Sequence, residues 1–134
     1  MIIKKELEDR VNSFSPSNNK ITISTYGGIN FLHIDFYYDS TAVAWTQICV
    51  NAAFIELKIA DFNSVYFKID GNGEEVIKEI INFAKYIGCD KIFSRIVVNN
   101  NFNELKKFYT KFGFDIKHTP KEKSYDSAKI CKLF

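Results

Sequence analysis

The sequence predicts a single α/β domain of the α+β kind, with a mixed central sheet flanked by helices. Apolar and polar residues alternate through much of 20–60, which is typical of half-buried strands. Apolar residues then recur at helical spacing in 77–87 and 105–112. A β-branched apolar run at 92–98 lies between these two segments and predicts a strand. The chain of 134 residues has the size of one domain with a real core, so we assign 1–134 to one domain.

The first half of the chain predicts one helix followed by antiparallel strands. Residues 2–14 form an amphipathic pattern whose apolar side is Ile3, Leu7, Val11 and Phe14. Strands are then expected at 20–26, 30–38, 42–50 and 53–60. Gly27-Gly28 is a hairpin signal between the first two strands. The short run 65–69 is interpreted either as a further strand or as part of a loop.

The second half predicts alternating helices and strands. A long helix is expected to begin near Glu74 and to end at Gly88. The run 92–98 is apolar almost throughout, which predicts a strand buried on both faces. A shorter helix through 105–112 is expected to end at Gly113. Two last strands are expected at 114–117 and 128–134.

Composition and charge exclude several classes of protein. The formal net charge of +2 gives no bulk argument for a nucleic-acid or membrane partner, although 103–134 carries eight Lys against four Asp and Glu. This basic end favours either a solvated face or attraction for an anionic ligand. Three widely spaced Cys with no metal-ligand pattern indicate free thiols and no metal site. The N-terminus is not a signal peptide, and no window is apolar enough to span a bilayer, so we expect a cytoplasmic protein.

A glycine-rich segment precedes the long helix. Lys68-Ile69-Asp70-Gly71-Asn72-Gly73 ends a possible strand and opens the helix. Unpaired backbone N–H groups and the helix dipole make such a terminus attractive to anions. Gly71 and Gly73 would let the backbone approach a phosphate closely. The same residues also suit an ordinary turn.

A second motif lies in the shorter helix, where Phe108-Tyr109-Thr110-Lys111-Phe112-Gly113-Phe114 combines an aromatic pair with a Gly-Phe ending. Together with the glycine-rich segment, it resembles the GNAT superfamily of acyl-CoA N-acyltransferases. The glycine-rich segment matches the family pattern Gln/Arg-x-x-Gly-x-Gly/Ala, and the second motif matches its Tyr-x-x-x-Gly-Phe signature. The resemblance covers 68–114 and implies the GNAT fold.

The resemblance also implies an activity and a set of residues. The expected reaction moves an acetyl group from acetyl-CoA to a primary amine by direct attack, without a metal. Tyr109 would protonate the leaving thiolate, although a core position is the commoner fate of such a side chain. The pyrophosphate of acetyl-CoA would be held by Lys68, Ile69, Asp70, Gly71, Asn72 and Gly73. Asn101 is a further cofactor candidate, with a turn role as its alternative.

The cofactor loop departs from the family pattern, and an alternative function follows. Lys68 stands in place of Gln or Arg, and it lacks their planar polar group. Carboxylates crowd the loop at Asp70, Glu74 and Glu75, where they would repel a pyrophosphate. The alternative is a catalytically inactive GNAT-fold protein that acts by protein–protein contact, for example as a homodimeric scaffold.

The acceptor side is assigned to 1–60 and the cofactor side to 61–134. Glu56 is the first candidate for the base that deprotonates the amine, and a surface ion pair with a neighbouring Lys is its structural alternative. His33 and Asp35 share a strand face and are the other candidates. Trp45, Tyr37 and Tyr38 are expected either to line an acceptor pocket or simply to fill the core. The expected partner is a small-molecule or protein amine; nucleic acid bound through Lys117, Lys121 and Lys123 is the weakest hypothesis.

Overall fold

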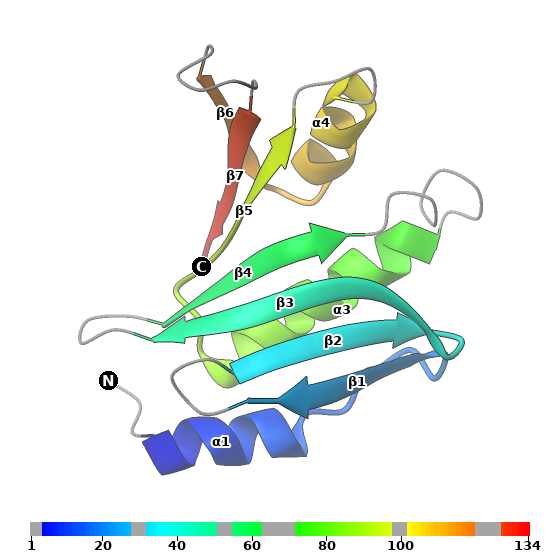
Figure 1. Ribbon diagram of the computed structural model, residues 1–134, viewed down its shortest axis with the longest axis vertical. Coiled ribbons are helices and arrows are strands. Elements are labelled where there is room, and N and C mark those ends of the chain that lie inside the picture. Colours follow the sequence, from blue (N-terminus) through cyan, green and yellow to red (C-terminus); the bar gives the residue numbers. More distant parts are fainter. Residues whose placement is uncertain (1–3, 28–31, 51–54, 63–71, 98–101, 120–126) are drawn as a thin grey trace.

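The computed structural model describes residues 4–27, 32–50, 55–62, 72–97, 102–119 and 127–134. One seven-stranded sheet runs through it in the order β1-β2-β3-β4-β5-β7-β6 (Figure 1). The helices are α1 (Lys4–Ser13), α3 (Asn72–Ile87) and α4 (Phe102–Lys111). The strands are β1 (Ile21–Tyr26), β2 (Leu32–Tyr38), β3 (Thr41–Val50), β4 (Ile55–Phe62), β5 (Lys91–Val97), β6 (Asp115–Thr119) and β7 (Ser127–Leu133).

The sheet is mixed because one pair of neighbouring strands is parallel. β4 and β5 run in the same direction, and the other neighbouring strands are antiparallel. Since parallel neighbours need a crossover, the long helix α3 lies between β4 and β5 in the chain. The predicted α/β class with a mixed sheet and flanking helices is confirmed. The possible strand at 65–69 lies outside the described residues.

The described helices pack on one face of the sheet. Cross-strand partners share a face, and the register joins Phe36 to Ala44 and Ala44 to Phe62. Phe36 contacts Phe83 of α3 with ring centroids 5.8 Å apart. Phe62 contacts Phe108 of α4 at 5.9 Å on the same face. In Figure 1, α3 passes behind β2, β3 and β4, and no described helix crosses in front of them.

The burial of strand β5 differs from the expectation from the sequence. It was expected to be buried on both faces, but the described helices cover only one of them: Ile92, Ser94 and Ile96 are buried, whereas Arg95 is exposed and Phe93 is half-buried. The pattern suggested two covered faces because Phe93 is apolar, so the strand lacks the regular alternation of a half-exposed strand. We call the face without a described helix the uncovered face of the sheet.

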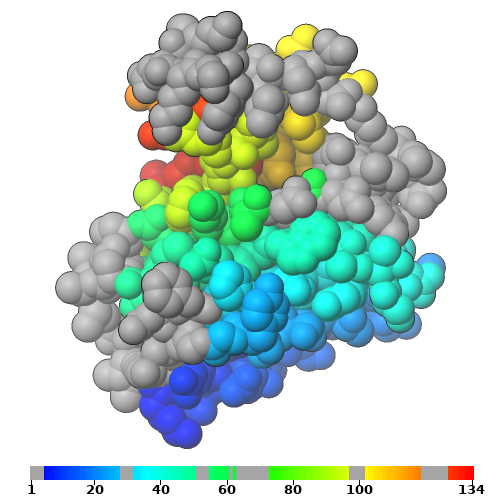
Figure 2. Space-filling model, in the orientation of Figure 1, coloured from blue at the N-terminus to red at the C-terminus, as the bar shows by residue number. Residues whose placement is uncertain are grey.

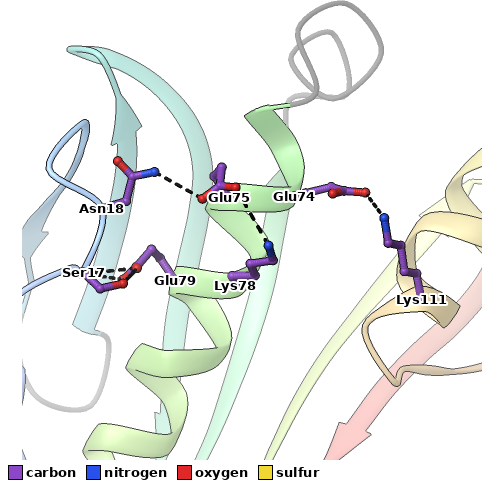
Figure 3. A network of polar contacts seen from close by, with 7 residues as sticks. All are labelled: Ser17, Asn18, Glu74, Glu75, Lys78, Glu79 and Lys111. Atoms are coloured by element: carbon purple, nitrogen blue, oxygen red, sulfur yellow. Dashed lines mark hydrogen bonds and ion pairs between the residues drawn. The ribbon is translucent and has the colours of Figure 1, made fainter.

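A buried carboxylate joins the segment after α1 to α3. Glu79 is only 3% exposed and accepts hydrogen bonds from the backbone N–H of Ser17 at 3.1 and 3.2 Å, and from the Ser17 hydroxyl (Figure 3). Phe14 packs nearby, edge-on against Phe83 at 5.1 Å. Because charged acceptors form stronger hydrogen bonds than neutral ones, this contact fixes where the chain enters β1.

Replacing Glu79 by Gln is expected to lower the free energy of unfolding by about 1–3 kcal/mol, since it removes the charge from a buried, multiply bonded acceptor. The measurement is urea unfolding. Glu75→Gln is the matched control on the same helix: its side chain is 47% exposed, and the expected change is within about 0.5 kcal/mol. Equal unfolding midpoints for the two variants would show that the Ser17 contact contributes nothing.

Candidate functional site

The two parallel strands β4 and β5 separate partway along their length. Their pairing runs from Glu56–Lys91 to Ile59–Ser94. At the last pair, the Ser94 hydroxyl donates to the Ile59 carbonyl at 2.6 Å. Both strands continue beyond it, and Figure 1 shows them pointing apart. The separation opens the sheet at the carboxyl ends of two parallel strands, where ligands of open α/β sheets bind.

Two helices flank this opening on the covered face. The sixteen-residue helix α3 starts at Asn72, and α4 contacts the end of β4 through Phe108 and Phe62. The side chain of Lys111, in the last turn of α4, donates to Glu74 in the first turn of α3. The positive end of the α3 dipole and its first backbone N–H groups therefore lie beside α4. Gly73, in that first turn, is buried.

The carboxylates of the first α3 turn already have partners. Figure 3 shows Glu74 extending toward α4 and Glu75 extending the other way, toward Asn18. Lys111 hydrogen-bonds Glu74 and holds the pKa of that exposed carboxyl below its ordinary value. Glu75 lies 3.9 Å from the Lys78 ammonium and accepts from the Asn18 amide at 3.3 Å. Both charges are thus partly compensated, which weakens the repulsion expected for an anion at this helix terminus.

Tyr109 lies in the core beneath α4. Its side chain is 2% exposed, and its ring packs edge-on against Phe108 at 5.2 Å and Phe114 at 5.3 Å. The helix ends just after it, as predicted, with Gly113 at φ +85° and the Phe114 N–H donating to the Tyr109 carbonyl at 3.1 Å. A side chain at Gly113 would also meet the Lys132 Nζ at 2.6 Å. This ending fixes the orientation of Tyr109.

The outer side of α4 carries a basic hollow. It has a volume of about 660 Å³ and is lined by Asn103, Lys106, Lys107, Thr110 and Lys111. Sequence reasoning noted the basic end of the chain but did not select these residues. The available signal was that each of them has another member three or four residues away along the helix, since residues so spaced are neighbours on a helix surface. The hollow could hold an anionic group.

Glu56 lies on the uncovered face. Its side chain is 15% exposed, and its Oε2 is 3.7 Å from the Lys91 Nζ. It precedes Ile59, the last residue of β4 that pairs with β5, by three residues, which is roughly 10 Å along a strand. The structure therefore does not bring Glu56 and Tyr109 together: they lie on opposite faces of the sheet.

The other acceptor-side candidates lie two strands away from β5 or further. His33 stacks on Tyr26 of the edge strand with ring centroids 4.9 Å apart. The Tyr26 hydroxyl lies 3.5 Å from the Asp35 carboxylate, and Asp35 pairs with Trp45 of β3. Since neighbouring strands are about 4.8 Å apart, β2 is roughly 10 Å from β4. His33 and Asp35 therefore lie two strand spacings from β4, and Asp35 is in register, through Trp45, with the end of β4.

Much of the predicted cofactor loop is outside the described residues. Lys68, Ile69, Asp70 and Gly71 are not described, and neither is Asn101. Asn72 begins α3. The structure does describe the N-terminus of α3, which directly follows this loop in the chain.

Two of the three thiols have a raised pKa. Burial raises the pKa of Cys89 to about 12, and burial also raises the pKa of Cys49, with a further contribution from Glu56. Both therefore stay protonated near neutral pH. Among the described residues, no group of three or more His, Cys, Asp or Glu is arranged to hold a metal ion. In the same part of the chain, no helix is long and apolar enough to cross a membrane.

Solved structures resemble this fold closely enough to classify it. A GNAT family acetyltransferase from Elizabethkingia anophelis with acetyl-CoA bound has a TM-score of 0.58 and 14% identity, over 87% of this chain and 100% of that chain. The ribosomal-protein-S18-alanine N-acetyltransferase of Escherichia coli has a TM-score of 0.58 and 13% identity, over 84% and 93%. Naa50 of Arabidopsis thaliana, in complex with the bisubstrate analogue CoA-Ac-MVNAL, has a TM-score of 0.53 and 19% identity, over 76% and 72%.

These similarities define the class of protein by its fold. The chain has the fold of the GNAT acetyltransferases, and the resemblance first seen in 68–114 is confirmed at that level. No protein-family model matches the sequence, and no curated protein matches it.

Proposed function

We propose that this protein is an acyl-CoA-dependent N-acetyltransferase that moves the acetyl group of acetyl-CoA to a primary amine by direct attack. The observation that carries the proposal is the separation of β4 and β5 beside the first turn of α3. A GNAT-fold neighbour has acetyl-CoA bound, and this chain shares its fold over 87% of its length.

The residues around the opening fit an anionic substrate such as acetyl-CoA. In the proposal, Lys68, Ile69, Asp70, Gly71, Asn72 and Gly73 hold the pyrophosphate at the positive end of α3, with Asn101 as a further ligand. The compensation of Glu74 by Lys111 supports this assignment, because it removes a nearby unpaired negative charge. The lysines of the α4 hollow supply further positive potential to the same side of the domain.

The proposed chemistry needs one proton acceptor and one proton donor. The amine nitrogen forms a bond to the thioester carbon, and the carbon–sulfur bond breaks. Glu56 is the proposed base. It lies about 10 Å along β4 from Ile59, where the pairing of β4 with β5 ends, so it would take the amine proton through water. Tyr109 is the proposed acid and would give its hydroxyl proton to the departing thiolate.

A second function is favoured by one observation. Tyr109 is 2% exposed and Glu56 already pairs with Lys91, so both have complete structural roles without a substrate. These are the positions expected in a catalytically inactive GNAT-fold protein that works by protein contact. The two functions differ in whether acetyl-CoA is consumed.

Acetyl transfer is tested by incubating the protein with acetyl-CoA and a panel of primary amines and following release of the free thiol. The panel contains small amines and peptides with free amino termini, since one fold neighbour is named for the alanine of a ribosomal protein. We expect amine-dependent thiol release together with an acetylated product by mass spectrometry. Thiol release at the same rate without any amine would instead indicate hydrolysis and contradict the proposed reaction.

A further inference from the structure

The uncovered face of the sheet holds a second hollow, separate from the one on α4. It has a volume of about 470 Å³, within the range of small-ligand sites, and lies over β4, β5 and β7. Its apolar part includes Phe93 and Cys131. Figure 2 shows this side of the molecule, where strand side chains reach the surface directly. We call this hollow the sheet groove.

The sheet groove is strongly basic. Its lining includes the cations Lys58, Lys91, Arg95 and Lys129 and one carboxylate, Glu56. Glu56 pairs with Lys91 at 3.7 Å, so the charge of that pair is largely balanced. Lys58, Arg95 and Lys129 are exposed and come from three different strands. The groove therefore attracts anions and repels amines that carry only positive charge.

The cations are too widely spread for one carboxylate. The distance from β4 across β5 to β7 is two strand spacings, or roughly 10 Å. Lys91 and Arg95 are four residues apart on β5, which is about 13 Å along the strand. An extended peptide repeats its side chains on one side about every 7 Å, so alternate acidic residues match this spread.

The sheet groove adjoins the opening between the parallel strands. Ser94 lines the groove, and its hydroxyl makes the last cross-strand contact, to Ile59, before β4 and β5 separate. Arg95, the next residue, lies beside the opening on the groove side. A chain held in the groove can thus present its terminal amine at the opening from the uncovered face.

We propose that the sheet groove binds the acceptor, and that the acceptor is a peptide or protein amino terminus followed by acidic residues. This inference rests on the proposed acetyl transfer for the fate of the amine, but the recognition itself rests on the charge, spacing and position of the groove. Lys58, Arg95 and Lys129 are specificity residues that pair with acceptor carboxylates.

The test measures peptide binding directly, by fluorescence anisotropy. The probes are a labelled peptide with a free amino terminus followed by a run of aspartates, and the same peptide with asparagines. We expect the acidic peptide to bind roughly tenfold more tightly at low salt, because several exposed ion pairs form and each contributes only a small part of the affinity. The double variant Lys58→Glu with Lys129→Glu is expected to abolish the difference. Equal affinities of the wild type for the two peptides would overturn the proposal.

Lys5→Glu is the matched control variant. It makes the same charge change at a side chain that is 79% exposed on α1, away from the groove, and we expect it to keep the preference for the acidic peptide. Circular dichroism checks that each variant is folded. Tighter binding of single-stranded RNA than of the acidic peptide, lost in the double variant, would also overturn the proposal, because it would assign the groove to nucleic acid.

The outcome separates this inference from the proposed function. Selective binding of the acidic peptide without thiol release from acetyl-CoA would support the groove assignment and contradict the acetyl transfer. Thiol release with neutral and acidic peptides at equal kcat/KM would support the transfer and contradict the groove assignment. In the transfer assay, the double variant should raise KM for the acidic peptide and leave kcat nearly unchanged, as expected for a specificity site.

Discussion

Replacing Tyr109 by Phe is expected to lower kcat for acetyl transfer by about 10²–10⁴-fold, the contribution typical of a positioned general acid. The substitution removes only the hydroxyl, so the ring keeps its contacts with Phe108 and Phe114. Affinity for acetyl-CoA should change little, because the proton is transferred only during bond cleavage. The measurement compares kcat, KM and calorimetric affinity for the wild type and the variant.

Tyr86→Phe is the matched control for this prediction. Tyr86 lies on α3, is 48% exposed, and its hydroxyl contacts the Ser13 hydroxyl at 2.8 Å. The same chemical change there should leave kcat unaltered. If Tyr109→Phe also retained full kcat, Tyr109 would be a core aromatic and not the acid. The inactive function gives a different result, with no transfer in the wild type.

Replacing Phe83 by Ala is expected to lower the free energy of unfolding by about 3–5 kcal/mol, the usual cost of truncating a buried Phe. Phe83 is 0% exposed and joins the segment after α1 to the sheet through edge-on contacts with Phe14 at 5.1 Å and Phe36 at 5.8 Å. Domains are typically stable by only about 5–15 kcal/mol, so the variant should unfold at much lower denaturant. Urea unfolding followed by circular dichroism measures the change.

The control for this prediction is Phe134→Ala. Phe134 is 45% exposed and lies at the C-terminus with the Lys85 Nζ 5.9 Å from its ring centre. Its loss should change stability by about 0.5 kcal/mol, as expected for a surface substitution. A Phe83→Ala variant as stable as Phe134→Ala would mean that α3 is not anchored through this cluster.

Most elements of the fold could be predicted from residue pattern. The apolar spacing of Ile77, Ile80 and Ala84 marked α3, and all three side chains are fully buried. Gly113 was expected to end the shorter helix, and it does so at φ +85°. These features are local, because the period of the pattern and the backbone freedom of glycine act over a few residues.

What could not be predicted depends on which face each element covers. The run around β5 suggested two buried faces, but Arg95 is exposed because the described helices all pack on the other side. Hydrophobic pattern shows how apolar a strand is and does not show where the helices lie. For the same reason the sheet groove was not predicted: Lys58, Arg95 and Lys129 are far apart in sequence and meet only when β4, β5 and β7 are neighbours.

The candidate site was predicted in part. The resemblance selected Tyr109 and the entry to α3 from two separate motifs. In the structure the helices that carry them, α4 and α3, meet through Lys111 and Glu74. Counting the carboxylates Glu74 and Glu75 in the sequence suggested strong repulsion of a pyrophosphate. The structure gives each a cationic partner, and the partner of Glu74 is Lys111, which lies 37 residues later in the chain. Such long-range pairing has no sequence signal of its own.

Calorimetric titration with acetyl-CoA measures whether the opening between β4 and β5, beside the first turn of α3, binds this substrate. We expect saturable binding with a dissociation constant of about 1 µM to 1 mM, the range of substrate KM values. Binding should be much weaker for S-acetyl-N-acetylcysteamine, which carries the same thioester without the pyrophosphate. Absence of acetyl-CoA binding at millimolar concentration, or equal affinity for the two thioesters, would mean that the opening is not an acetyl-CoA site.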